Sequence, residues 1–296
     1  VPPLPSGRCA SSVRDCGWVL DEDTPMWPGI CSLRRHVSRA PDTTRFPNCR
    51  SKQGFELNGG HGTHIDAPAH FVGGGRTVDE LRPEELVGVP LAVVDVEAAC
   101  DRDADHAVTQ AELQVDEERN GPIMPGSLVC VRTGWARRMA AGREQVAKQR
   151  SAAESEESGP IFTAYHNIGE ADDIHPDYKF PRMHFPGLSP AGATWLVRDR
   201  CAVGVGVDTM SPDPGASEGN AVHHAILGAD RYILENLNLE GLPARGATAV
   251  VAPVKLRGSP EAPTRVFALL PQPPAGPPDS ESAPRPCKRG RSNAAE

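Results

Sequence analysis

Short runs of apolar, often β-branched residues recur along the chain and are separated by polar, turn-forming segments. Five of these runs stand out, at residues 91–96, 127–132, 201–207, 249–256 and 264–270. Runs of this length are typical of buried strands. The pattern therefore predicts a sheet built from buried strands.

Helical segments fall between these strands. One short helix is predicted at 80–86 and another at 134–141. Thr109 and Ser189 are suitable N-caps for two more helices, and Pro190 takes the first helical position after Ser189. Strands alternate with helices, and the chain has no internal repeat, Gly-x-Gly-x-x-Gly loop or Gly-x-Ser-x-Gly motif. We therefore expect a single α/β domain and no dinucleotide-binding fold.

The predicted domain spans residues 17–271, because the segments that flank it differ in composition. Residues 1–16 are rich in Pro and Ser, so we expect a flexible N-terminal segment. Residues 272–296 are rich in Pro, Ser and Gly, so we expect them to be disordered. The basic cluster at 288–291 matches either a nuclear address or a solvated tail, and we favour the tail.

An irregular insertion is predicted inside the domain, at residues 143–184. Its first part is rich in Ser, Glu and Ala, so we expect it to be mobile or weakly helical. His166, His175 and His184 are irregularly spaced among polar residues. We expect these histidines at solvent-exposed loop positions.

The composition is ordinary for a soluble globular protein and restricts the classes of partner. Of the 296 residues, 39% are apolar and 24% are charged, and the net charge is −8. Negative charge disfavours nucleic acid and anionic membranes as partners, and no apolar run approaches the roughly 20 residues that span a bilayer. The eight cysteines form no Cys-x-x-Cys pair, which disfavours a thiolate zinc site and fits a reducing compartment. We expect a cytoplasmic protein, although a targeting segment upstream of Val1 would be unreadable.

The densest chemistry lies at residues 58–71, Asn-Gly-Gly-His-Gly-Thr-His-Ile-Asp-Ala-Pro-Ala-His-Phe. Side chains alternate between the two faces of a strand, so His64 and Asp66 point to the same side and can bind one metal ion. Pro68 turns the chain and leaves His70 at the edge of the same site, where a base or proton donor fits better than a third ligand. The competing interpretation is a Gly-rich turn whose histidines face solvent.

Two ligands cannot close a metal site, so further ligands must come from other segments. The best sources are Glu235 and either His223 or His224, which lie among apolar residues where an unpaired charge is costly. Histidine on a partly apolar helix is more often structural, so this signal is weak by itself. Trp27 lies in a loop of turn-forming residues and is either a core residue, which the residues alone favour, or one wall of a ligand pocket.

The segment Gly-Thr-His-Ile-Asp-Ala-Pro-Ala-His-Phe at 62–71 resembles the signature of the cyclase family of metal-dependent hydrolases, which includes bacterial kynurenine formamidases and isatin hydrolases. Further segments have counterparts in the same order, at 24–29, 185–190, 204–213 and 234–237. The resemblance covers residues 17–271. It implies a swivelling β/β/α fold, with a mixed sheet and flanking helices in one domain, and a homodimer or higher homo-oligomer.

The resemblance also implies roles for individual residues. In the family, the residues that match His64 and Asp66 bind metal, and the residue that matches His70 is the acid/base. A later histidine and a glutamate twelve residues beyond it complete a two-metal site in the formamidases. His223 and Glu235 have this spacing, whereas His224 and Glu235 do not.

One family ligand is missing from this chain. The family's first metal-binding histidine is expected at Gly60, whereas the nearby histidine is His61. An offset of one residue places His61 on the opposite face of a regular strand. The glycines at 59, 60 and 62 would permit a bulge that swings the side chain back. We therefore predict that His61 replaces the missing ligand.

The predicted activity is hydrolysis of an amide or cyclic amide C–N bond in a small aromatic substrate such as N-formylkynurenine or isatin. One or two Zn or Mn ions per subunit would activate water, with His70 as the acid/base and, as the resemblance implies, Trp27 against the substrate. The alternative is an inactive family member that binds a small molecule. Gly60 favours this alternative, whereas His70 and the pair His223 and Glu235 argue against it.

Overall fold

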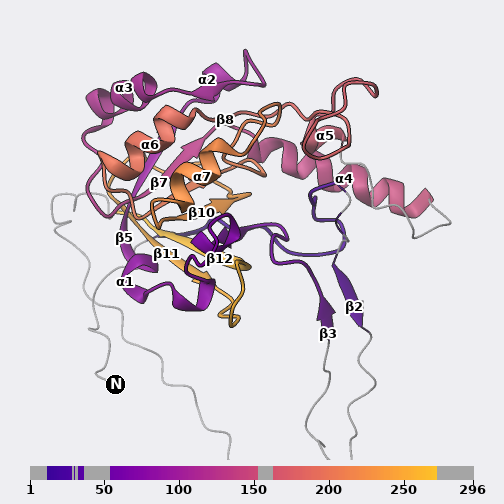
Figure 1. Ribbon diagram of the computed structural model, residues 1–296, viewed down its shortest axis with the longest axis horizontal. Coiled ribbons are helices and arrows are strands. Elements are labelled where there is room, and N and C mark those ends of the chain that lie inside the picture. The colour runs from indigo at the N-terminus through magenta and orange to yellow at the C-terminus, as the bar shows by residue number, and fades with distance from the viewer. Residues whose placement is uncertain (1–11, 29, 31–32, 37–53, 153–162, 272–296) are drawn as a thin grey trace, which may run out of the picture.

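A mixed sheet of eight strands forms the centre of the protein, in the order β1-β12-β11-β5-β7-β9-β10-β4. The computed structural model describes residues 12–28, 30, 33–36, 54–152 and 163–271 (Figure 1). The strands of the sheet span Val13–Asp15 (β1), His64–Asp66 (β4), Val87–Asp95 (β5), Leu128–Arg132 (β7), Gly204–Val207 (β9), Tyr232–Glu235 (β10), Ala247–Pro253 (β11) and Glu261–Leu269 (β12). Strands β5, β7, β9 and β10 are parallel, and the other pairings are antiparallel. The predicted α/β domain with a mixed sheet is confirmed.

Strand β4 closes this sheet on itself. It pairs antiparallel with β10 along one edge and antiparallel with the beginning of β12 along the other. The strand that carries the predicted ligands therefore lies between two others, and both neighbours can place side chains beside those ligands.

Alternate residues of the sheet face two separate cores, as the two-residue period of a strand requires. Val129 of β7 packs in the core beneath the helices that cover one face of the sheet (Figure 1). Those helices are α3 (Gln110–Asn120), α6 (Pro190–Arg198) and α7 (Ala221–Leu227). The next residue, Cys130, packs in a second core together with Leu234 and with Leu86 of α1 (Pro83–Leu86).

The predicted helix starts at Thr109 and Ser189 are confirmed. The Glu112 amide donates to Thr109 Oγ1 at 3.3 Å, and the Gly192 amide donates to Ser189 Oγ at 3.1 Å. The five predicted strands correspond, in chain order, to β5, β7, β9, β11 and β12, although their ends are shifted. Strand β9 begins three residues later than predicted because Cys201 has a φ of 50°, a left-handed conformation that interrupts an extended strand.

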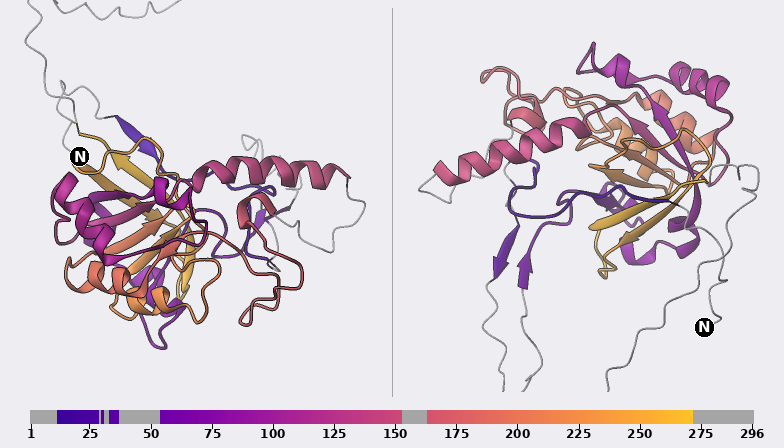
Figure 2. Two further views of the ribbon diagram at one scale, coloured as in Figure 1. Left: turned by 90° about the horizontal axis from the view of Figure 1, so that it is seen from above. Right: turned by 180° about the vertical axis from the view of Figure 1, so that it is seen from behind.

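The remaining elements lie around the sheet. They are β2 (Arg34–His36), β3 (Gly54–Glu56), η1 (Pro68–His70), η2 (Val78–Glu80), α2 (Glu97–Cys100), β6 (Ala107–Val108), α4 (Ala136–Ala152), α5 (Thr163–His166) and β8 (Gly187–Leu188). The β2–β3 ribbon and α4 both extend away from the body of the protein on the same side (Figures 1 and 2). Among the described residues, no helix has the length and apolar character needed to cross a membrane.

The predicted flanking segments are described only in part. Residues 13–15, expected to be flexible, form β1 and pair with β12. Residues 143–152 of the predicted insertion continue α4 as a regular helix. Residues 1–11, 153–162 and 272–296, the last with the basic cluster, lie outside the described residues.

The expectation of solvent-exposed histidines is wrong for His166 and His175, which are 0% and 1% exposed. His166 Nε2 lies 2.8 Å from the Met26 carbonyl oxygen, and His175 Nε2 lies 2.7 Å from the Ser217 carbonyl oxygen. These partners come from distant segments and offset the cost of burying an imidazole, which a polar local sequence does not reveal. His184 is only partly exposed.

Candidate metal centre

The register of β4 gathers the predicted ligands on one face of the sheet. His64 lies directly opposite Glu235 of β10, and Asp66 lies directly opposite Glu261 at the start of β12. Residues that face each other across antiparallel strands project to the same side, as do residues two apart on one strand. Two strand pairings thus bring one histidine and three carboxylates together.

His223 completes the cluster from the buried face of α7, whereas the adjacent His224 is exposed. His223 Nε2 is 3.3 Å from Glu235 Oε1 and 3.7 Å from Asp66 Oδ2. His64 Nε2 is 3.2 Å from Glu235 Oε2 and 3.5 Å from Asp66 Oδ1. Each carboxylate therefore directs one oxygen toward each imidazole. The two histidines and two acids are all 5% exposed or less.

Both imidazoles are held through their Nδ1 atoms. His64 Nδ1 donates to the Gly62 carbonyl oxygen at 2.8 Å, and His223 Nδ1 donates to Asp213 Oδ2 at 2.6 Å. Asp213 also accepts hydrogen bonds from the backbone amides of His223 and Val222 at the start of α7, at 3.0 and 2.8 Å. These contacts fix the rings and direct both Nε2 atoms toward the carboxylates, as second partners of metal-binding histidines do.

The cluster has an electrostatic field that favours positive charge at its centre. Burial lowers the pKa of His64, but the carboxylates of Asp66 and Glu235 outweigh it and raise the pKa to about 10. Burial also opposes the charged form of His223, yet its bond to Asp213 and the nearby carboxylates raise its pKa well above the usual range. Burial would raise the pKa of Asp66, but the histidines, His64 foremost, lower it.

The donor atoms of this cluster fit a divalent metal ion. Asp66 Oδ1 is buried and forms no hydrogen bond within the part of the chain that the structure describes, although buried carboxylate oxygens normally have a partner. Donor atoms of His64, Asp66 and Glu261 lie within 4.8 Å of one another, as do those of Asp66, His70 and His223. Imidazole nitrogen and carboxylate oxygen are common ligands of Zn and Mn. The two groups share Asp66.

His70 lies at the edge of the cluster and next to a cavity. It ends the 3-10 turn η1, which begins at Pro68, and it is less buried than the other histidines of the cluster. The adjoining cavity has a volume of about 250 Å³ and is bordered by His70 together with His64, Asp66 and the rest of the cluster. His70 therefore has access both to the cluster and to a small molecule in the cavity.

Aromatic side chains form another part of the cavity wall. Trp27 and Tyr178 both line the cavity, with ring centroids 5.0 Å apart and planes inclined at 72°. Phe180 makes a similar edge contact with Trp27 at 6.1 Å, and the Tyr178 hydroxyl donates to Asn220 Oδ1 at 2.6 Å. These contacts hold the partly exposed indole at the cavity and outside the fully buried core.

His61 does not join the cluster. It is 0% exposed, does not border the cavity, and its Nε2 lies 3.4 Å from the Asp21 carbonyl oxygen. The neighbouring Gly62 has a φ of 60°, and a Cβ there would lie 2.3 Å from Leu20 Cδ2, so glycine is favoured at this position. The geometry gives no support to the prediction that His61 replaces the ligand missing at Gly60.

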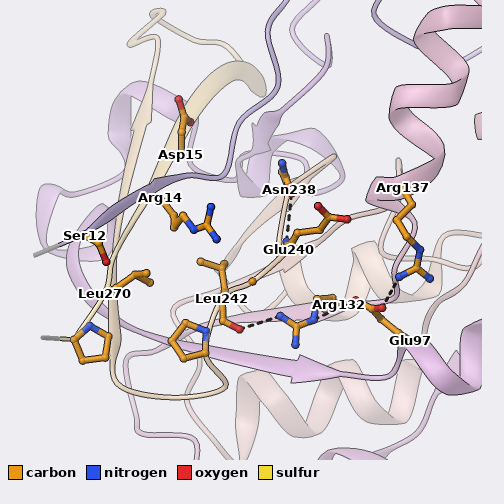
Figure 3. A pocket seen from close by; sticks show the side chains of 13 residues that line it. Ser12, Arg14, Asp15, Glu97, Arg132, Arg137, Asn238, Glu240, Leu242 and Leu270 are labelled. Atoms are coloured by element: carbon orange, nitrogen blue, oxygen red, sulfur yellow. Dashed lines mark hydrogen bonds and ion pairs between the residues drawn. The ribbon is translucent and has the colours of Figure 1, made fainter. Parts of the chain in front are cut away.

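A larger recess of about 870 Å³ lies elsewhere on the protein and is bordered by none of these residues (Figure 3). Charged side chains line it, and four of them form ion pairs within the fold, namely Asp15, Glu97, Arg132 and Arg137. Arg137 Nη1 lies 2.5 Å from Glu97 Oε2, and Arg132 Nη1 donates to the Leu242 carbonyl oxygen at 2.9 Å (Figure 3). The histidine cluster is therefore the stronger candidate site.

Sequence reasoning missed two residues of the cluster, Asp213 and Glu261. Asp213 lies in a loop of turn-forming residues, and its contact with His223 depends on where α7 begins. Glu261 begins β12, three residues before the strand predicted at 264–270, and its position beside Asp66 depends on a pairing between distant segments. No pattern in the neighbouring sequence predicts either contact.

Comparison with known proteins identifies the family. The family model described as "Putative cyclase" matches residues 15–214. The chain belongs to this cyclase family. The resemblance carried by residues 62–71 is therefore confirmed, and the cluster of histidines and carboxylates lies in a cyclase-family fold.

Relatives of this cyclase-family chain include two named hydrolases. It is 29% identical over 221 residues to isatin hydrolase from Roseibium aggregatum, covering 71% of this chain and 72% of the relative. It is 27% identical over 254 residues to kynurenine formamidase from Maricaulis maris, covering 85% of this chain and 94% of the relative. The structure of isatin hydrolase A from Ralstonia solanacearum has a TM-score of 0.71 at 29% identity, covering 88% of this chain and 92% of that one. The fold is therefore shared with isatin hydrolases.

Proposed function

We propose that this protein is a metal-dependent hydrolase that cleaves an amide or cyclic amide C–N bond in a small aromatic substrate. The observation that carries the proposal is the placement of Asp66 and Glu235 between the Nε2 atoms of His64 and His223, beside an aromatic-walled cavity. The relatives support the reaction type, because isatin hydrolase and kynurenine formamidase are both named for hydrolysis of such bonds.

His64, Asp66, His223 and Glu235 would hold one or two ions of Zn or Mn per subunit. Such an ion, when bound, lowers the pKa of water toward neutrality and polarises a carbonyl group. The protein itself directs both Nε2 atoms inward, through the hydrogen bonds of the Nδ1 atoms. It also buries the carboxylates, which strengthens their attraction for a cation.

His70 would exchange a proton with the leaving nitrogen. It borders the cavity but is more exposed than the ligands, so it can reach a substrate atom. A donor atom of its ring lies within 4.8 Å of donor atoms of Asp66 and His223, so the proton would be delivered next to the cluster. A positioned histidine side chain is suited to both accepting and donating a proton.

Trp27 and Tyr178 would bind the aromatic part of the substrate. Their edge-to-face contact leaves the indole in the cavity wall. A volume of about 250 Å³ suits a small molecule. The choice of N-formylkynurenine or isatin as test substrates follows from this size and from the two relatives, and the former would place the reaction in tryptophan catabolism.

Initial rates on matched substrates test the proposal. Protein supplied with Mn or Zn would be assayed with N-formylkynurenine, isatin and an aliphatic N-formyl amide. We expect turnover of at least one aromatic amide and much weaker turnover of the aliphatic one. A lack of turnover on a broad panel of amides, with metal bound, would contradict the proposed activity. As part of the same proposal, the protein acts as a homodimer or higher homo-oligomer, which sedimentation would measure.

A further inference from the structure

We propose that Glu261 is a metal ligand in this chain and takes the place of the histidine that is absent at Gly60. The inference rests on the metal-dependent function proposed above and concerns the side of the site that holds His64 and Asp66. It assigns the missing coordination to a residue from β12, and not to His61 in the sequence that precedes β4.

Position 60 faces the ligand cluster, although glycine has no side chain. A Cβ on Gly60 would lie 3.4 Å from His64 Nε2 and 3.0 Å from Glu261 Oε2. A side chain at this position would therefore enter the space where the Glu261 carboxylate lies. A Cβ on Gly59 would lie only 2.6 Å from Glu261 Cγ. The two glycines thus leave room for Glu261. Its carboxylate lies in the space that a side chain at position 60 would enter.

The backbone of β12 holds Glu261 in this position. Glu261 pairs directly with Asp66, and the Ala67 amide donates to the Pro260 carbonyl oxygen at 2.8 Å. Side chains of directly opposed residues project to the same face. A carboxylate oxygen of Glu261 accordingly lies within 4.8 Å of donor atoms of both His64 and Asp66.

The proposed donor set also has a consequence for metal preference. A carboxylate is a harder ligand than an imidazole, and replacing an imidazole by a carboxylate raises the affinity for Mn relative to that for Zn. With Glu261 in place of a histidine, the side of the site that holds His64 and Asp66 contains one nitrogen and two carboxylate ligands. Returning a histidine to position 60 should therefore raise the affinity for Zn relative to that for Mn.

His61 is the rival source of the missing ligand. His61 is fully buried, its Nε2 lies near the Asp21 carbonyl oxygen, and it does not border the cavity. A comparison of variants at 61 and 261 therefore separates the two assignments.

Metal titrations of the metal-free full chain test the inference without an activity readout. The free Mn²⁺ signal in electron paramagnetic resonance reports Mn binding, and competition with a chromophoric chelator reports Zn binding. The variants are Glu261→Gln, His61→Gln, the double variant Gly60→His with Glu261→Gly, and Glu240→Gln. Glu240 is exposed and does not border the cavity, so it is the matched control. Circular dichroism of each metal-free variant verifies folding.

We expect Glu261→Gln to weaken Mn binding at least about tenfold, while His61→Gln and Glu240→Gln leave it within about twofold. The double variant should bind metal more tightly than Glu261→Gln and show a raised ratio of Zn to Mn affinity. An unchanged Mn affinity in folded Glu261→Gln would overturn the inference and leave the metal-dependent function intact. If the wild-type chain binds no metal and still hydrolyses substrate, the inference and the metal-dependent mechanism fail together.

Discussion

Glu235 of β10 lies directly opposite His64 of β4, and its Oε2 is 3.2 Å from Nε2 of that histidine. The other oxygen of the same carboxylate lies 3.3 Å from His223 Nε2. One glutamate thus connects a strand histidine near the beginning of the chain with a helix histidine near its end. This relationship shows why His223 and Glu235 belong to one site, because the turn between α7 and β10 brings both to β4.

Replacement of His70 separates proton transfer from metal binding. We expect His70→Ala to lower kcat/KM about 10²- to 10⁴-fold, because a positioned acid/base contributes that much, with metal content unchanged. Initial rates and elemental analysis of the same preparation provide the two readouts. His224→Ala is the control, since that residue is exposed and does not border the cavity. Loss of metal in His70→Ala would instead make His70 a ligand.

Asp213 should affect metal binding without contacting the ion. Its carboxylate accepts the Nδ1 hydrogen of His223 at 2.6 Å and fixes the ring. We expect Asp213→Asn to weaken metal binding about 10- to 100-fold, as is typical when such a partner is removed. Asp103→Asn is a suitable control, because Asp103 is exposed and its carboxylate accepts a local hydrogen bond from the Asp105 amide. Equal metal affinity in the two variants would show that Asp213 merely caps α7.

The strand part of the site could be read from the sequence, because it depends on local geometry. His64 and Asp66 are two residues apart, and the period of a strand alone places them on one face. Glu261 could not be found in this way, since its position depends on the register between β12 and β4. A shift of one residue in that register would turn Glu261 to the opposite face of the sheet.

The backbone before β4 also departed from expectation for a physical reason. We expected the glycines to allow a bulge that would bring His61 toward the ligands. Instead, a turn closed by the hydrogen bond from the His61 amide to the Asn58 carbonyl oxygen precedes the left-handed Gly62, and His61 is buried with its Nε2 near the Asp21 carbonyl oxygen. Glycine at 60 is explained by the Glu261 side chain that fills the adjacent space, and a single sequence does not reveal that contact.

Trp27 should determine preference for aromatic substrates. We expect Trp27→Ala to raise KM for an aromatic amide about tenfold, equivalent to the loss of roughly 1.4 kcal/mol of stacking, with a smaller change in kcat. Trp27→Phe should recover part of the loss, and KM for an aliphatic amide should change little. The kinetic constants of the three proteins on both substrates measure this effect. An equal rise in KM for both substrates would contradict aromatic recognition by Trp27.

Glu85 gives stability a defined dependence on pH, independent of the site. Burial opposes its ionisation, but Arg76 Nη1 at 2.8 Å and Arg82 Nη2 at 3.1 Å outweigh burial and lower the pKa of Glu85 to about 2. Because the folded pKa is below the usual value of about 4.5, the stabilisation is complete above pH 4.5 and is lost as the pH falls toward 2.

The variant Glu85→Gln tests this dependence. We expect it to lower the free energy of unfolding by about 1–3 kcal/mol at pH 7, and the difference from wild type should shrink as the pH falls from 4.5 toward 2. Urea unfolding at several pH values measures both quantities. A difference that stays constant over this range would show that the Arg76 and Arg82 contacts do not control the ionisation of Glu85.

Removal and return of the metal tests the central claim most directly. The purified protein would be treated with a chelator, dialysed, and assayed for hydrolysis of the best aromatic amide before and after addition of Mn or Zn. We predict that activity falls to background with the loss of bound metal and returns in proportion to the metal restored, whereas Asp66→Asn neither retains metal nor regains activity. Full activity in protein shown by elemental analysis to be free of metal would contradict the account.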